Sequence, residues 1–288
     1  MKIRTATPSR ALAAALLVAA AAAPALAQQL DLPRPSPKAT VSQVVGLTDV
    51  TIAYCRPGVK GRTIWGDLVP YGQVWRTGAN EATTITFSTD VTVAGNPVPA
   101  GTYGLFTIPG KDEWTVILNK GAKQWGAYEY TQAEDFVRFT VKPQAAPFAE
   151  RMTFSFPNTT MDATDVALAW EKVQITFPIK VDVNTKVIAD ARAALGAVKP
   201  DDWRTPLRAA VYCLDNDVNL QEARGWMEKS LAAKETMYGL MAKARFAALD
   251  GKTTEAIAVI KKAIEVGKSA TPPNDIAPAE RLLAEWSK

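Results

Sequence analysis

The residues best suited to chemistry lie in one stretch, residues 56–87, where basic, amide, acidic and aromatic side chains alternate with glycine and proline. An arginine guanidinium can bind a carboxylate, sulfate or phosphate through two parallel hydrogen bonds. An indole ring offers a flat stacking face, and a nearby amide can orient the bound group. We therefore predict an anion or sugar site in this stretch. Its predicted ligand-binding residues are Arg56, Arg62, Trp75, Arg76, Asn80 and Glu81.

Two other interpretations of this stretch stay open. Loops that pack against a core need polar partners for their backbone groups, so the same side chains could be purely structural. Asp67 and Glu81, 14 positions apart, are the weak catalytic candidates, because two carboxylates facing one groove would suit glycoside hydrolysis. Neither a nucleophile elbow nor a phosphate-binding loop is present, which argues against the common hydrolases and nucleotide-binding enzymes.

The residue counts exclude several kinds of site. The chain has no histidine, so histidine general bases and histidine metal ligands are excluded. Its two cysteines, Cys55 and Cys213, are too few for a cysteine-only zinc site. We predict neither a metal nor a cofactor. The sequence favours two buried free thiols and leaves a Cys55–Cys213 disulfide open as the alternative.

The N-terminus has the pattern of a secretory signal peptide over residues 1–27. Three basic residues precede an alanine-rich apolar run that is too short to span a membrane comfortably, and Ala25-Leu26-Ala27 provides the small residues of a cleavage site. We therefore expect a periplasmic or secreted protein with no membrane span after cleavage. Cleavage would leave 30 of the 33 basic residues and all 29 acidic ones, a net charge of +1. Such a balance gives no reason to expect a nucleic-acid partner.

The rest of the chain divides in two. Residues 28–37 are rich in proline and are predicted to be an extended linker. Residues 38–181 contain short runs of valine, isoleucine, threonine and aromatic residues between turn signals, which predicts an all-β antiparallel sandwich. The last two predicted strands, 165–170 and 173–179, are expected to form a hairpin around a two-residue turn at Glu171-Lys172.

In residues 184–288 the apolar residues recur at helical spacing, and the segment contains an internal repeat. The segment 219–223 aligns without gaps on 252–256, an offset of 33 positions, and each unit reads as two helices. This length is typical of tetratricopeptide repeats, so we predict an all-α helical-repeat domain. Its surface could dock a protein or peptide partner, or it could be a structural cap.

The β part also resembles a known family over residues 36–181. The residues that carry the resemblance are SPKATVSQVVGLTDVTIAYCRPGVKGRTIWGDLVPYGQVWRTGANEATTITFSTDV, PAGTYGLFTIPGKDEWTVILNK and QWGAYEY. They are similar to the exported bacterial domain of unknown function DUF2911. The resemblance implies an exported β-rich domain, sometimes followed by helical repeats, and it implies no activity and no catalytic residues. The function predicted from the residues is a non-catalytic binding protein; a glycan hydrolase and a purely structural envelope protein are the alternatives.

Overall fold

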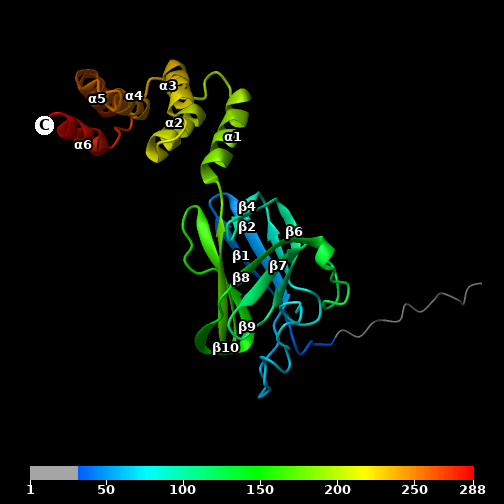
Figure 1. The fold of residues 1–288 in the computed structure, drawn as a ribbon. Coiled ribbons are helices and arrows are strands. Elements are labelled where there is room, and N and C mark those ends of the chain that lie inside the picture. Colours follow the sequence, from blue (N-terminus) through cyan, green and yellow to red (C-terminus); the bar gives the residue numbers. More distant parts are fainter. Residues whose placement is uncertain (1–31) are drawn as a thin grey trace, which may run out of the picture.

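A computed structural model describes residues 32–288 and shows a β-sandwich followed by six α-helices (Figure 1). The arrangement confirms the predicted fold class. The predicted signal peptide lies outside the described residues, as do the first four residues of the predicted linker. Within residues 32–288, no helix has both the length and the apolar character needed to cross a membrane.

The sandwich consists of two antiparallel sheets. The first has six strands in the order β1-β2-β3-β6-β7-β8, and the second has four in the order β5-β4-β10-β9. The strands are β1 (Lys38–Val45), β2 (Thr48–Cys55), β3 (Thr84–Phe87), β4 (Val91–Val93), β5 (Asn96–Val98), β6 (Gly101–Ile108), β7 (Trp114–Asn119), β8 (Asp135–Val141), β9 (Gln144–Ser155) and β10 (Ala163–Lys180).

Alternation along each strand explains why the two sheets pack face to face. Ile52, Ile85 and Leu105 come from three neighbouring strands of the first sheet and are almost completely buried. Leu168 and Phe177 on β10 are equally buried on the inner face of the second sheet. Since successive side chains of a strand point to opposite faces, the intervening residues form the outer surface. On β2 these include Ala53, which is exposed.

The predicted hairpin at Glu171-Lys172 is wrong. Residues 163–180 form one long strand, β10, which pairs with β9 on both sides of Glu171. Glu171 has a φ of 57°, and the register shifts on either side of it. Such a residue forms a β-bulge, which bends the strand without reversing it. The strand continues because β9 is 12 residues long and supplies partners to both halves.

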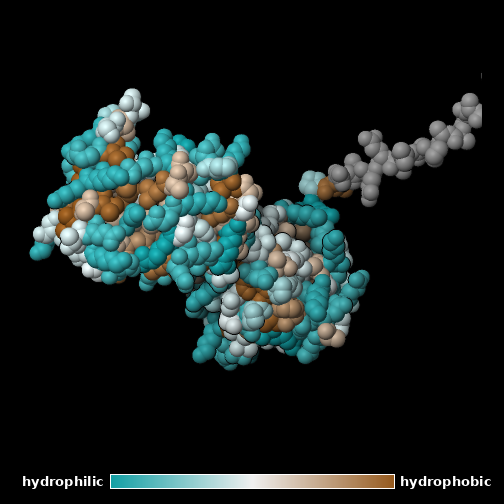
Figure 2. Space-filling view, turned by 90° about the horizontal axis from the view of Figure 1, so that it is seen from above, coloured by the Kyte–Doolittle hydropathy of each residue, from teal (hydrophilic) through white to brown (hydrophobic). Residues whose placement is uncertain are grey.

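The helices form a second unit beyond one end of the sandwich, where β10 leads into α1 (Figure 1). From α2 to α4 and from α3 to α5, the first residue shifts by 33 positions, which matches the internal repeat. Figure 2 shows apolar residues among the hydrophilic surface of this unit. The helices are α1 (Val183–Gly196), α2 (Arg204–Asn216), α3 (Leu220–Ala233), α4 (Met237–Leu249), α5 (Thr253–Ser269) and α6 (Ala277–Trp286).

The sandwich and the helices have separate hydrophobic cores. Cys55 lies at the end of β2, whereas Cys213 lies in the core of α2 and its neighbours. Both cysteines are buried and free. The disulfide that the sequence left open is therefore absent from the structure.

Candidate functional site

The N-terminal strap, which we define as residues 32–37, lies against the loop that ends at Glu81. Asn80 Nδ2 donates to the Ser36 carbonyl over 3.2 Å, and Arg151 Nη1 donates to the Pro35 carbonyl over 2.9 Å. The backbone N–H of Arg56 donates to the Pro37 carbonyl over 2.9 Å. The described part of the predicted linker is thus held by side chains and backbone of the β-domain.

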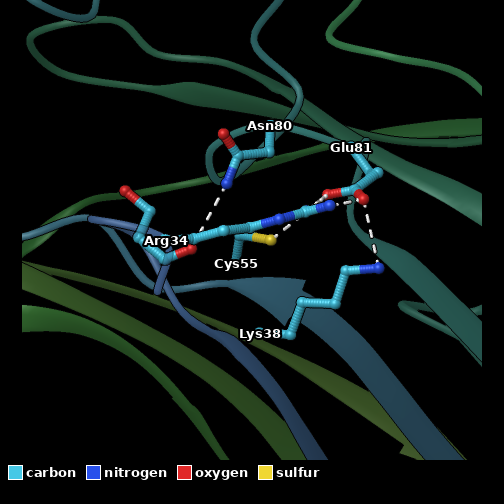
Figure 3. Close-up of polar contacts among 6 residues, drawn as sticks. Arg34, Lys38, Cys55, Asn80 and Glu81 are labelled. Atoms are coloured by element: carbon cyan, nitrogen blue, oxygen red, sulfur yellow. Dashed lines mark hydrogen bonds and ion pairs between the residues drawn. The ribbon is translucent and has the colours of Figure 1, made fainter. Parts of the chain in front are cut away.

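Glu81 is the centre of the polar contacts beneath the strap (Figure 3). Arg34 Nη1 donates to both carboxylate oxygens over 2.8 Å, and Lys38 Nζ lies 3.1 Å from Oε1. The Cys55 thiol lies 3.5 Å from Oε2. The hydrogen bond from Arg34 is the main cause that lowers the pKa of Glu81 to about 2, and burial raises the pKa of Cys55. Glu81 is therefore an ionised carboxylate near neutral pH and holds no proton to donate.

This pKa predicts a pH dependence of folding. The pKa of Glu81 falls from an ordinary 4.5 to about 2 in the folded chain, so its contribution to stability is fully present above about pH 4.5. That contribution is lost as the pH falls through about 2. We expect Glu81→Gln to reduce the loss of unfolding free energy between pH 5 and pH 2, measured by urea unfolding at each pH. Equal losses in Glu81→Gln and the unsubstituted chain would contradict the assignment.

A second group of site residues forms the arginine–tryptophan pocket, a cavity of about 210 Å³. Its walls come from the strap, the 57–79 loops and β10. The residues that line it are Ser36, Pro57, Arg62, Leu68, Val69, Trp75, Arg76, Gly78, Ala79 and Trp170. Trp75 and Trp170 stack with ring centroids 5.9 Å apart, and Trp65 meets both rings edge-on. The indoles thus form one rigid side of the pocket.

Arg76 is the unusual residue of this pocket. Its side chain forms no ion pair and no hydrogen bond with any of residues 32–288, and its Nε is buried. Trp170 Nε1 is a second buried donor that has no acceptor in the described part of the chain. Buried donors in native proteins are nearly always paired, and each unpaired one costs about 1–3 kcal/mol. Two such donors on residues of one pocket favour an acceptor that binds there.

The backbone around Arg76 is fixed on both sides. The neighbouring Trp75 exchanges two backbone hydrogen bonds with Thr107 of β6, over 2.7 and 3.0 Å. The carbonyl of Arg76 accepts from the N–H of Thr83 over 3.1 Å, and Trp75 Nε1 donates to the Gly78 carbonyl over 3.0 Å. These hydrogen bonds fix the backbone at Arg76, so its side chain extends from a rigid position.

The predicted ligand-binding residues divide into three groups. Arg62, Trp75 and Arg76 line the arginine–tryptophan pocket, whereas Asn80 and Glu81 hold the strap. The guanidinium of Arg56 donates to the Met152 carbonyl and to Thr153 Oγ1 on β9. Arg62 also donates to the Gly58 and Val59 carbonyls, so it supports its own turn as well.

The two weak catalytic candidates are not brought to one cavity. Asp67 is exposed and forms no hydrogen bond or ion pair with the described residues, and it does not line the cavity that Glu81 lines. Sequence reasoning missed Trp170, Ser36 and Arg34. Ser36 and Arg34 lie in a segment whose proline content pointed only to a linker, and Trp170 sits in a core strand far along the chain.

The fold and the site define a two-part protein, a β-sandwich with an arginine- and tryptophan-lined pocket and an appended helical-repeat unit. Residues 36–179 match the family described as "Protein of unknown function (DUF2911)". The match covers half of the chain, and the protein belongs to this family. No curated protein and no solved structure matches the chain.

Proposed function

We propose that this protein is a non-catalytic binding protein that holds a small anionic ligand in the arginine–tryptophan pocket. The observation that carries the proposal is Arg76, a cation without an acidic partner among the described residues and with a buried, unpaired Nε. Arg62, which forms no ion pair within the described chain, adds a second positive charge to the same pocket. An anion would supply the acceptor that the Arg76 guanidinium lacks and a counter-charge for Arg62, whose guanidinium already donates to two backbone carbonyls. Charge-assisted hydrogen bonds of this kind are the stronger ones.

The size of the pocket limits the ligand. Pockets for drug-sized molecules usually occupy about 300–1,000 Å³, and this one occupies about 210 Å³. A sulfate, a phosphate or a small carboxylate fits this volume, and the planar guanidinium matches their oxygen geometry. The stacked indoles give the ligand a non-polar wall that lowers the local dielectric and strengthens its contacts with the arginines.

The proposal includes a partner and a location. The helical unit is proposed as a face for a protein or peptide partner, because stacked helix pairs present extended surfaces beside their own cores. The protein is proposed to act in the periplasm or outside the cell, on the signal-peptide pattern of residues 1–27. Glycan hydrolysis by Asp67 and Glu81 gains no support from the positions of those residues.

The test is calorimetric titration of the protein with inorganic phosphate, sulfate and succinate at low ionic strength. We expect saturable binding of at least one of them, accompanied by a rise in unfolding temperature, since a ligand of the native state stabilises it by mass action. Arg76→Ala should remove both effects. Arg281→Ala is the matched control, because Arg281 is exposed on α6 and forms no ion pair within the described chain.

Two results would overturn the proposal. One is the absence of binding and of any thermal shift for all three anions. The other is an equal loss of binding in Arg76→Ala and Arg281→Ala, which would mean that anion binding depends only on the net charge of the protein.

A further inference from the structure

A larger cavity lies beside Glu81, outside the sandwich core. It occupies about 470 Å³ between the outer face of β1, β2 and β3 and the loop of residues 121–124. It shares no lining residue with the arginine–tryptophan pocket. The residues that line it are Lys38, Ala39, Thr40, Ala53, Tyr54, Cys55, Glu81, Ala82, Thr84, Ala122, Lys123 and Gln124. We call it the alanine cavity, after the four alanines in its lining.

The alanine cavity combines an apolar interior with surplus positive charge. Ala53 is exposed and Ala122 is partly exposed, and their small side chains leave room that larger ones would fill. Glu81, its one acidic lining residue, already contacts two cations, Arg34 and Lys38. Lys123 is exposed on the facing loop and forms no ion pair within the described chain. The lining therefore carries two lysines, Lys38 and Lys123, against one ionised carboxylate, a net charge of +1.

Gln124 adds an independent sign of a missing partner. Its Nε2 donates to the Gly121 carbonyl over 2.8 Å, which fixes the amide, while its Oε1 is buried and accepts from no described residue. A buried acceptor without a donor is rare in native structures, so this oxygen favours a ligand that supplies a donor. The Thr40 and Thr84 hydroxyls, which also line the cavity, form no hydrogen bonds with described residues.

We infer that the alanine cavity is a second ligand site, for an amphipathic organic anion. The apolar body of the ligand lies against the alanines, its anionic group faces Lys123, and a hydroxyl or N–H of the ligand donates to Gln124. The volume falls within the usual range for small-molecule sites, about 300–1,000 Å³. An apolar lining with a few converging polar groups is also the usual composition of such sites.

The inference is independent of the proposed function, because the two cavities have different lining residues and different ligand sizes. A small inorganic anion cannot use the alanine surface, and an organic anion with a long apolar body exceeds the volume of the arginine–tryptophan pocket. Arg76→Ala should consequently leave this second site unchanged, so either proposal can fail alone.

The probe for the test is 8-anilinonaphthalene-1-sulfonate, whose fluorescence rises in an apolar environment and whose sulfonate carries the required charge. The full chain is titrated with the probe, and bound probe is then displaced with hexanoate, 1-hexanol, hexylammonium or glucose. We expect hexanoate to displace it at roughly tenfold lower concentration than 1-hexanol. Hexylammonium and glucose should be ineffective.

Three variants locate the response. Ala53→Phe fills the cavity from the exposed face of β2 and should abolish the displaceable signal; phenylalanine is tolerated well in strands. Lys123→Ala, on an exposed loop, should weaken probe binding roughly three- to tenfold. Lys111→Ala is the matched control, because Lys111 is exposed on the β6–β7 turn and forms no ion pair with described residues.

Several results would overturn the inference. Equal displacement by hexanoate, 1-hexanol and hexylammonium would mean that the probe senses apolar surface alone. Displacement by glucose would assign the cavity to a neutral saccharide instead. If Lys123→Ala and Ala53→Phe both bind the probe as well as Lys111→Ala does, the probe binds elsewhere, for example on the helices.

Discussion

Replacing Arg76 with methionine is expected to weaken anion binding strongly while leaving the unfolding free energy unchanged or raising it by about 1 kcal/mol. Methionine keeps an unbranched side chain in the same place and removes a buried donor that has no partner in the described chain. A donor paired only by a ligand costs stability in the free protein. Loss of a charge-assisted hydrogen bond worth about 1.5–3 kcal/mol corresponds to a roughly 10- to 100-fold weaker anion affinity.

Arg56→Met is the matched control for this experiment. Arg56 belongs to the same loop region but donates to the Met152 carbonyl over 2.9 Å and to Thr153 Oγ1 over 2.7 Å. Its removal leaves those acceptors without their donor, so we expect a loss of about 1–3 kcal/mol of unfolding free energy. Urea unfolding of both variants decides between a ligand site and a structural role. A loss in Arg76→Met as large as that in Arg56→Met would make Arg76 structural.

The order of the two units could be predicted because the spacing of apolar residues changes where the sandwich ends and the helices begin. β10 ends at Lys180 and α1 begins at Val183, close to the point at which alternation gives way to helical spacing. The 33-residue offset located the helix pairs for the same reason, since each unit repeats its own buried positions. The fold class therefore follows from local patterns that need no long-range information.

The error at Glu171 shows where local patterns fail. Two residues between alternating segments satisfy the rule for a hairpin, and a residue with positive φ occurs both in tight turns and in bulges. The choice depends on whether a neighbouring strand continues past the irregular residue. β9 continues past Glu171 and pairs with both halves of β10. This tertiary pairing cannot be predicted from the sequence of β10 alone.

The candidate site was predictable only in part for a similar reason. Arg62, Trp75 and Arg76 are close in sequence, so one loop region can bring them to one pocket. Trp170 reaches the same pocket from β10, nearly 100 positions away, and the strap reaches it through hydrogen bonds between backbone carbonyls and distant side chains. Every residue has the same backbone carbonyl acceptor, so no residue type predicts which carbonyls will accept these hydrogen bonds.

Trp170→Ala is expected to have the largest effect on folding. Trp170 is only 1% exposed, stacks on Trp75 and meets Trp65 edge-on with centroids 5.7 Å apart. Truncating a buried aromatic side chain of this size removes about 3–5 kcal/mol of unfolding free energy. The loss should appear in urea unfolding of the sandwich, followed by the near-ultraviolet circular dichroism of the indoles. The helical signal at 222 nm should move little, because the helices have their own cores.

Trp170→Phe separates packing from the unpaired indole N–H. Phenylalanine keeps an aromatic ring against Trp75 and Trp65 and removes the buried donor at Nε1, so its stability loss should be well under half that of Trp170→Ala. If that donor serves the ligand, Trp170→Phe should also weaken anion binding while the sandwich stays folded. An alanine variant as stable as the unsubstituted chain would show that the indoles do not form a packed cluster. A phenylalanine variant with unchanged anion affinity would remove Trp170 from the site and leave Arg62 and Arg76 to hold the ligand.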